Sequence, residues 1–419
     1  MRTHRLLATA ATAASLALAL LFTTSHAEAQ TETVLHAFAG KDGVSPSLSL
    51  TFDSAGNLYG VAAEGGSSNN GTVFELSPKG SSWTEKTLIS FNGGSGGSQP
   101  VGGLIVDSSG NLYGTTKAGG SNGNGLVFEL SKASSGSWTE TILHNFGTAR
   151  DGRFPTGTLV FDSSGNLYGT TEGGGAFGDG TQTKGGTAFK LAPGSAGWSE
   201  TVIHSFGNGT DGANPRCNLV LDSSGNVYGT AMNGGANAFG AVYEISPQAH
   251  GGWKEKLIYS FNPVNNFSDG LHPVAGLVFD NAGNLYGTTI FGGGQGGGIV
   301  FELSPTSSGS WNETVISSFE QPFFEPSNLY SGLVFDAEGN LYGATLRGGG
   351  TSTLFDGTLY KLTPAGGGTW TNTTLFAFGA THGAVPGVGS LVLDSSGNVY
   401  GATQAGGANK DGVVFKITQ

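Results

Sequence analysis

The chain has 419 residues and a formal net charge of −12, and only 11% of its residues are charged, whereas an average globular domain has about 25%. A negative chain repels phosphate backbones, so we expect no nucleic-acid partner. The single cysteine, Cys217, excludes an internal disulfide. The fold must therefore be stabilised by burial of apolar side chains, and the sequence assigns no role to this cysteine.

Residues 1–29 have the pattern of a secretory signal peptide. Two arginines precede an apolar run over residues 6–22, and an Ala-Glu-Ala site ends at Ala29. This order predicts cleavage near Ala29 and export, to the extracellular medium or alternatively to the periplasm. An uncleaved signal anchor is the rival interpretation. Later in the chain, no apolar run approaches the ~18 residues that a membrane span needs, so we predict no such span.

A ten-residue motif typified by "DSSGNLYGTT" recurs seven times along the rest of the chain, at a spacing of between 54 and 60 residues. Its copies begin at Asp53, Asp107, Asp162, Asp222, Asp280, Asp336 and Asp394. A near-constant period in this range is typical of solenoids and propellers. The third unit holds four short β-rich runs, "TLVFD", "NLYGTT", "GTAFKL" and "WSETVIHSF". Four short strands per unit predict a propeller blade.

The "DSSG" segment predicts a tight hairpin turn between the first and second strands. Asp occupies the first corner of a type I turn and can cap its backbone, and Gly occupies the fourth corner, where φ is positive. A second glycine, Gly60 in the first unit, lies inside the following strand, where we expect a neighbouring backbone to come close. Metal binding by Asp53 and its copies is the alternative interpretation, which seven identical sites on one rim disfavour.

The last unit is completed by the opposite end of the chain. Each of the six tryptophans begins a fourth strand, but the seventh unit stops at "VVFKITQ" without one. The segment "TETVLHAF" at residues 31–38 matches the fourth-strand segment "TETILHNF" at residues 139–146. Pairing the two termini closes a ring and removes exposed strand edges. We therefore predict an all-β fold in which residues 30–419 form a single seven-bladed β-propeller.

The segments "LHNF" and "DGRFPTGTLVFDSSGNLYGTTEGGG" resemble the GloVer tandem repeat, which occurs in secreted bacterial proteins with a choice of C-terminal anchors. The resemblance extends over nearly all of residues 31–419 and implies export and repetition. It implies no agreed activity, so no catalytic residue is transferred. No sorting tail precedes Gln419, so the resemblance does not extend to surface attachment. The core is also similar to NHL propeller repeats, which implies that the run before "DSSG" is the innermost strand.

The variable loops indicate where a ligand would bind. The turns at one rim are nearly uniform across the units, whereas the loops between strands two and three and between units vary in length and content. Binding residues concentrate on variable loops of a rigid scaffold. In units three to six these loops carry the aromatic candidates Phe154, Phe177, Phe239, Phe267, Phe291, Phe323, Phe324, Tyr330 and Phe355. Such faces stack on sugars or hold an apolar partner; local packing is the alternative.

Four of the loops between units share a "DGxxP" motif, which is first of all a turn signal. Its aspartates are Asp42, Asp151, Asp211 and Asp269. Asp151, Asp211 and Asp269, together with Arg153, are candidate ligand-binding residues. The alternative to a purely structural turn is a partial ring of carboxylates that binds Ca²⁺. His272 and His382 are the histidines on these loops, and either is a candidate base beside Asp269 or Arg153. His272 also joins the ligand-binding candidates.

From the sequence we expect a secreted, monomeric, non-enzymatic propeller that binds an extracellular glycan or protein ligand through units three to six. The sequence has no nucleophile motif, zinc-ligand spacing or phosphate loop. We therefore name no catalytic residue and no metal ligand. We expect no cofactor, with Ca²⁺ left open as the alternative. A propeller lyase or hydrolase acting on polysaccharide and a structural component of the envelope or matrix are the alternatives.

Overall fold

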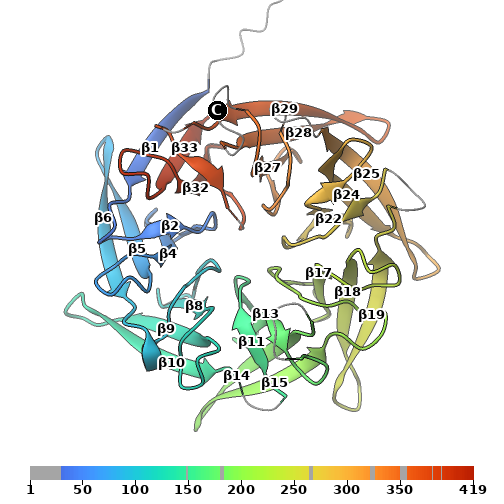
Figure 1. Cartoon of the computed structure of the whole chain (residues 1–419), viewed down its shortest axis with the longest axis horizontal. Helices are drawn as coiled ribbons and strands as arrows, with labels where there is room; N and C mark the ends of the chain where they lie inside the picture. The colour runs from blue at the N-terminus through green and yellow to red at the C-terminus, as the bar shows by residue number, and fades with distance from the viewer. Residues whose placement is uncertain are drawn as a thin grey trace, which may run out of the picture.

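The computed structural model describes residues 30–147, 150–179, 184–263, 268–320, 326–349, 356–379, 381–387 and 389–419. Within these ranges the strands form seven sheets, arranged as the blades of a ring (Figure 1). This arrangement confirms the predicted seven-bladed β-propeller. The predicted signal peptide, residues 1–29, lies outside the described residues. No helix in the described ranges has the length and hydropathy that crossing a membrane requires.

The first two blades follow the four-strand plan. Blade 1 contains β2 (Val44–Pro46), β3 (Thr51–Phe52), β4 (Leu58–Glu64), β5 (Thr72–Lys79) and β6 (Ser82–Ser90). A short 3₁₀-helix, η1 (Gly94–Gly96), precedes blade 2, which contains β7 (Ile105–Val106), β8 (Leu112–Thr116), β9 (Leu126–Lys132) and β10 (Trp138–Asn145). In blade 1 the inner strand is split in two, because β2 and β3 both pair with β4.

Blades 3 to 5 repeat the plan with small elaborations. Blade 3 contains β11 (Gly152–Pro155), β12 (Val160–Phe161), β13 (Leu167–Gly174), β14 (Thr187–Gly194) and β15 (Gly197–Ser205). Blade 4 contains β16 (Val220–Leu221), β17 (Val227–Ala231), β18 (Ala241–Pro247) and β19 (Trp253–Ser260). Blade 5 contains β20 (Gly270–Leu271), β21 (Val278–Phe279), β22 (Leu285–Thr288), β23 (Phe291–Gly292), β24 (Gly296–Pro305) and β25 (Trp311–Glu320).

The last two blades bring the chain back to its start. Blade 6 contains β26 (Val334–Phe335), β27 (Leu341–Thr345), β28 (Thr358–Gly366) and β29 (Thr369–Ala377). Blade 7 contains β30 (Ala384–Pro386), β31 (Val392–Leu393), β32 (Val399–Ala405), β33 (Val413–Thr418) and the N-terminal strand β1 (Thr31–Ala37). In each blade the fourth strand lies on the outer circumference of the ring (Figure 1).

The N-terminal strand closes the ring as predicted. β1 pairs antiparallel with β33, with Thr31 opposite Thr418. Just beyond β1, the backbone N–H of Phe38 donates to the carbonyl of Gly412 at 3.1 Å. The Phe38 ring is fully buried and meets Phe74 of blade 1 edge-on, with the ring centroids 5.0 Å apart. This strand therefore completes blade 7 and also packs against blade 1.

The repeated aspartate holds the hairpin turn, and Asp162 shows how. Its Oδ1 accepts hydrogen bonds from the backbone N–H groups of Ser164 and Asn166, and its Oδ2 accepts one from the Tyr168 hydroxyl at 3.1 Å. Gly165 has φ of 80°, as the predicted turn requires. Burial alone would raise the pKa of Asp162, but these hydrogen bonds outweigh it and lower the pKa. The carboxylate therefore has a structural partner at each oxygen.

The glycine inside each second strand makes room for an aromatic ring. Gly60 lies opposite Phe74 in the β4–β5 register. A Cβ atom at Gly60 would meet Cζ of Phe74 at 2.5 Å and Cδ2 of Leu50 at 2.8 Å. The expectation of a close neighbouring backbone was therefore wrong at this position, because the close neighbours are the side chains of Phe74 in β5 and of Leu50 just before β3.

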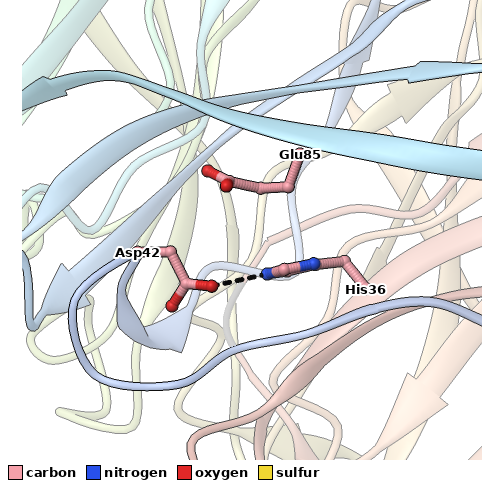
Figure 2. Close-up of side chains that lie close together, drawn as sticks. All are labelled: His36, Asp42 and Glu85. Atoms are coloured by element: carbon pink, nitrogen blue, oxygen red, sulfur yellow. Dashed lines mark hydrogen bonds and ion pairs between the residues drawn. The ribbon is translucent and has the colours of Figure 1, made fainter.

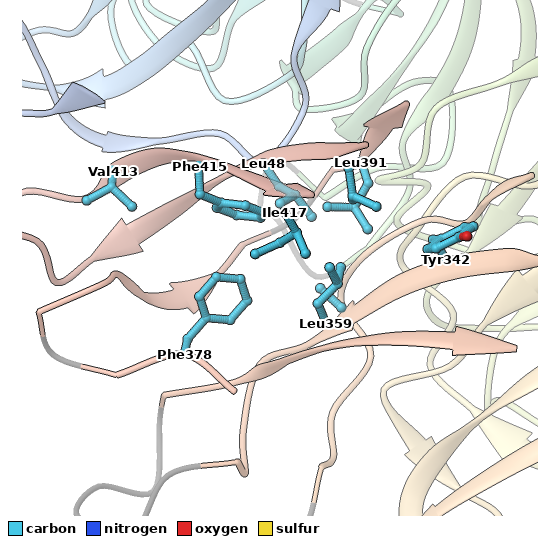
Figure 3. Packing of buried hydrophobic residues seen from close by; sticks show 10 residues of the cluster. Leu48, Tyr342, Leu359, Phe378, Leu391, Val413, Phe415 and Ile417 are labelled. Atoms are coloured by element: carbon cyan, nitrogen blue, oxygen red, sulfur yellow. The ribbon is translucent and has the colours of Figure 1, made fainter. Parts of the chain in front are cut away.

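The apolar core lies between successive blades. Figure 3 shows Leu359 and Phe378 of blade 6 packed against Phe415 and Ile417 of blade 7, with Leu48 at the boundary with blade 1. All five side chains are almost completely buried. Each blade is thus stabilised mainly by the faces of its neighbours, and an interrupted ring would expose apolar surface.

Candidate functional site at the propeller axis

A cavity of about 190 Å³ lies where the seven blades converge. One set of its lining residues follows the proline, or its equivalent, in the loops between units: Ser47, Val101, Thr156, Arg216, Val274 and Tyr330. A second set lies near the end of the second strand, within two residues of it: Ala63, Lys117, Glu172 and Gln404. Since these residues come from all seven blades, the cavity lies on the axis, at the rim with variable loops. We call it the axial cavity.

A repeated backbone conformation fixes the wall of the axial cavity. The residue before the proline, or before Leu329 in blade 6, has a positive φ, between 55° and 61°, in every blade. Its N–H donates to a carbonyl of the preceding blade, as from Asn214 to Gly185 at 2.8 Å. A left-handed conformation costs a non-glycine residue about 1–2 kcal/mol, so the inter-blade contact must hold it in place. The residue after the proline is thereby directed to the axis.

An ion cluster occupies one side of the axial cavity. Glu172, from blade 3, is completely buried, and its Oε2 lies 3.1 Å from Nζ of Lys117 in blade 2. Its Oε1 is ion-paired with Nη2 of Arg216 in blade 4. The amide of Asn214 donates to the backbone carbonyl of Glu172 at 2.9 Å. Three consecutive blades therefore meet in one group with two positive charges and one negative charge.

The remaining wall is mixed in character. Tyr330 offers an aromatic face, Gln404 offers an amide, and Val101 and Val274 are apolar. Within the described residues, Oγ1 of Thr156 and Nε of Arg216 are buried without a hydrogen-bond partner, and Oε2 of Glu172 has only its ion pair with Lys117. Buried polar atoms in native proteins are nearly always hydrogen-bonded. Two such atoms on residues that line one cavity indicate a place for a polar ligand.

Of the aromatic candidates that are described, Tyr330 lines the axial cavity and the others do not. Phe177 and Phe291 are 41% and 37% exposed, whereas Phe154 and Phe239 are half-buried. Phe239 packs against the apolar cluster between blades 4 and 5, as the packing alternative expects. The remaining candidates, Phe267, Phe323, Phe324 and Phe355, lie outside the described residues.

The "DGxxP" aspartates are hydrogen-bonded to the outer strands and not directed to the axis. Asp151 accepts hydrogen bonds from the backbone N–H groups of Gly147 and Gly152, and its Oδ2 lies 3.1 Å from Nε2 of His144. Asp211 makes the same contact with His204 at 3.0 Å. The "LHxF" and "DGxxP" motifs, which the sequence presents separately, are therefore two halves of one contact.

Asp269 keeps this arrangement with a different partner. Its Oδ2 accepts from the hydroxyl of Tyr259 at 3.1 Å and from the N–H of Asn262 at 2.6 Å. Burial raises the pKa of Asp269, and the hydrogen bonds only partly offset this effect. The four aspartates thus anchor their own loops, and calcium binding by them stays a prediction.

The remaining polar candidates also lie away from the axial cavity. Nδ1 of His272 lies 2.9 Å from the carbonyl oxygen of Met232, and Nδ1 of His382 lies 2.6 Å from Glu32. Arg153 is half-buried in β11, opposite Gly173. None of these three residues is part of the cavity lining.

A second cluster of polar side chains lies at the circumference, on the seam between blades 7 and 1. Figure 2 shows His36 of β1, Asp42 of the following loop and Glu85 of β6 facing one another. Their ligand atoms all lie within 4.8 Å, a spacing that could accommodate a metal ion. Nε2 of His36 lies 2.9 Å from Asp42, and burial raises the pKa of Glu85. Because His144 and Asp151 form the same pair on another seam, we interpret the cluster as an architectural contact.

Sequence reasoning missed the ion cluster of the axial cavity. Its acid and one of its cations occupy the same repeat position, four residues after the tyrosine of "YGTT", and Arg216 follows a proline. At the position four residues after the tyrosine, five of the seven units have an uncharged residue, and only Lys117 and Glu172 are charged. Comparing the units at this single position would have found two of the three residues.

The repeat also assigns the chain to a family. The sequence matches the Gloeobacter/Verrucomicrobia repeat over residues 5–184 and over residues 178–334. The chain belongs to the Gloeobacter/Verrucomicrobia repeat family. Membership of this family confirms the resemblance drawn from the repeated motif. Among curated proteins, none matches the sequence.

Solved structures share the fold of this Gloeobacter/Verrucomicrobia repeat protein. The extracellular domain of a hybrid two-component system from B. thetaiotaomicron has a TM-score of 0.55 at 13% identity, over 92% of this chain and 39% of that one. A protein from Lactobacillus plantarum has a TM-score of 0.52 at 14% identity, over 83% and 88%. Puromycin hydrolase has a TM-score of 0.53 at 11% identity, over 87% and 50%. At such identities the likeness shows the fold alone.

Proposed function

We propose that this protein is an exported, non-enzymatic propeller that binds the end of an extracellular glycan in the axial cavity. The observation that carries the proposal is the convergence of all seven blades on one cavity with a charged cluster and unpartnered buried polar atoms. The signal pattern of residues 1–29 and the repeat family support export. A protein ligand presented to the same rim is the alternative.

The size and lining of the axial cavity suit one sugar residue. Its volume of about 190 Å³ is below the ~300–1,000 Å³ of pockets that enclose drug-sized ligands, so it would hold the end of a chain and not a long segment. Tyr330 offers a ring for stacking against the apolar face of a sugar. Thr156 and Gln404 offer hydrogen bonds to its hydroxyl groups.

Glycan-array binding followed by calorimetry tests the site. We expect Tyr330→Ala to weaken binding of any captured glycan at least about tenfold, as the loss of a stacking aromatic at a buried contact does. The matched control is Phe291→Ala, which removes an exposed aromatic of the same rim outside the cavity, and it should bind like the parent protein. The opposite pattern would move the site to the loop aromatics.

Two further outcomes would overturn the proposal itself. The first is the absence of any captured glycan together with a melting temperature that the same sugars leave unchanged. The second is polysaccharide cleavage by the purified protein that His272→Ala or His382→Ala abolishes without unfolding it, because this outcome would establish the lyase or hydrolase alternative.

A further inference from the structure

We infer that the axial cavity selects a ligand with a single carboxylate, such as a uronic acid at the end of a glycan, and that Arg216 binds this carboxylate. The inference rests on the proposed function and names the chemical class of its ligand. Three features of the described residues carry it: the charge balance of the cavity, the exposure of its arginine and the unpartnered atoms beside it.

The charge balance of the axial cavity favours a monoanion. Among the described residues that line it, Lys117 and Arg216 are the cations and Glu172 is the acid. The cavity therefore carries one excess positive charge in a chain whose formal net charge is −12. A charge held in a partly enclosed site interacts more strongly than one in open water. One carboxylate would neutralise the excess, a neutral sugar would leave it, and a doubly charged anion would reverse it.

The two sides of the ion pair differ in their access to the cavity. The Glu172 side chain is completely buried, whereas the Arg216 side chain is 36% exposed. Glu172 therefore holds the guanidinium from the protein side and leaves part of it open to the ligand. A guanidinium has five N–H donors in a planar fork that matches a carboxylate. Glu172 acts here as a positioning residue, because it fixes the orientation of the arginine.

Two polar atoms beside the exposed part of the guanidinium lack a hydrogen-bond partner among the described residues. Nε of Arg216 is buried and has no hydrogen-bond partner among the described residues, and the same holds for Oγ1 of Thr156. Both residues line the cavity and occupy the same repeat position in adjacent blades, after Pro155 and Pro215. Both atoms have almost no accessible surface, so a ligand oxygen would reach them only after a small side-chain movement, whereas the exposed part of the guanidinium is open to a carboxylate directly.

The test compares glucuronic acid with its methyl ester and with glucose, by calorimetry on the purified protein. The ester keeps the shape and removes the charge, so the comparison isolates the carboxylate. We expect the acid to bind at least about tenfold more tightly than the ester, the range for a charge-assisted hydrogen bond. The preference should also shrink as salt is raised. Galacturonic acid with its ester repeats the test for another hydroxyl geometry.

Arg216→Lys tests the residue assignment, because it keeps the charge and removes the planar fork. We expect the acid-over-ester preference to fall, because the planar fork is lost, but not to vanish, because the positive charge remains, while the ester affinity stays unchanged. Thr156→Val, which removes the hydroxyl at similar volume, should weaken both ligands equally. If Arg216→Lys does not fold, the acid-to-ester ratio of the parent protein decides the inference alone.

The outcomes separate the inference from the proposed function. Equal binding of acid and ester would overturn the inference and leave glycan binding in place. Tighter binding of a sulfated sugar than of the acid would overturn the choice of carboxylate. An Arg216→Lys protein with its preference intact would overturn the role of the arginine. Absence of binding to acids, esters and neutral sugars alike would count against the proposed function itself.

Discussion

The stability of the propeller should depend on the protonation of Glu140, a carboxylic acid on the seam between blades 1 and 2. Glu140 lies on β10, and its Oε1 is buried without a hydrogen-bond partner among the described residues. The equivalent acid of blade 1, Glu85, lies beside His36. The residue that corresponds to His36 on the blade 1–2 seam is Ile89. With no compensating partner there, burial raises the pKa of Glu140 to about 7.

The sign of the effect follows from the direction of this change. The folded protein favours the protonated acid, so the stabilising contribution is complete below the unfolded pKa of 4.5 and is lost as pH rises through about 7. The pKa rises from 4.5 in the unfolded chain to about 7 in the folded protein. At about 1.4 kcal/mol per pKa unit, this rise sets an upper limit of about 3 kcal/mol for the cost of the charged form. Since the side chain is only half-buried, solvent screening reduces this cost, and we expect about 1–2 kcal/mol at pH 8.

Glu140→Gln tests the effect, because glutamine keeps the shape and stays neutral at every pH. In urea unfolding, we expect its free energy of unfolding to exceed that of the parent by about 1–2 kcal/mol at pH 8 and to match it near pH 4.5. Glu338→Gln, at an exposed turn, is the control and should show no such pH-dependent gain. A gain for Glu140→Gln that is the same at both pH values would refute the reasoning.

Three further predictions concern ring closure and the glycine positions. Phe38→Ala should lower the free energy of unfolding by about 3–5 kcal/mol, whereas Val34→Ala, on the exposed side of the same strand, should cost under about 1 kcal/mol by urea unfolding. Deleting residues 30–38 should lower the melting temperature and produce self-association by light scattering, because β33 loses its outer partner β1 and becomes an exposed edge. An unchanged, monodisperse protein would contradict closure. Gly60→Ala should destabilise by about 1–3 kcal/mol through its clash with the facing ring, while Gly294→Ala, with open space around its Cβ position, should unfold at the same urea concentration as the parent.

The fold could be predicted from the sequence because each repeat encodes the strands and turns of its own blade. The turn around Asp162 needs residues at most six positions apart, so its pattern is visible in a short window. Closure of the ring by β1 could also be predicted, because residues 31–38 resemble a segment found elsewhere in the chain. The error at Gly60 arose because a glycine indicates a close neighbour without identifying it. Only the β4–β5 register brings Phe74 opposite.

The axial site was not predictable in the same way. Lys117, Glu172 and Arg216 lie in three different units and share no local motif, so they meet only because the ring brings equivalent positions to one axis. Comparison between loops favoured the aromatic residues, since length and composition vary most visibly there. The sequence identified the "DGxxP" aspartates as turn residues. Their contact with the outer-strand histidine could not be predicted, because it depends on where the connecting loop folds back.

The left-handed residue before each proline has a consequence for how such propellers can diversify. Its N–H donates a hydrogen bond to a backbone carbonyl of the neighbouring blade. The framework of the cavity therefore does not depend on which side chain follows the proline. Serine, valine, threonine and arginine occupy that following site in this one molecule, and tyrosine occupies it in blade 6, where Leu329 replaces the proline. A change of ligand would then need only substitutions of the residues that follow the prolines, while the backbone stays fixed. A library confined to those positions would explore new specificities without rebuilding the scaffold.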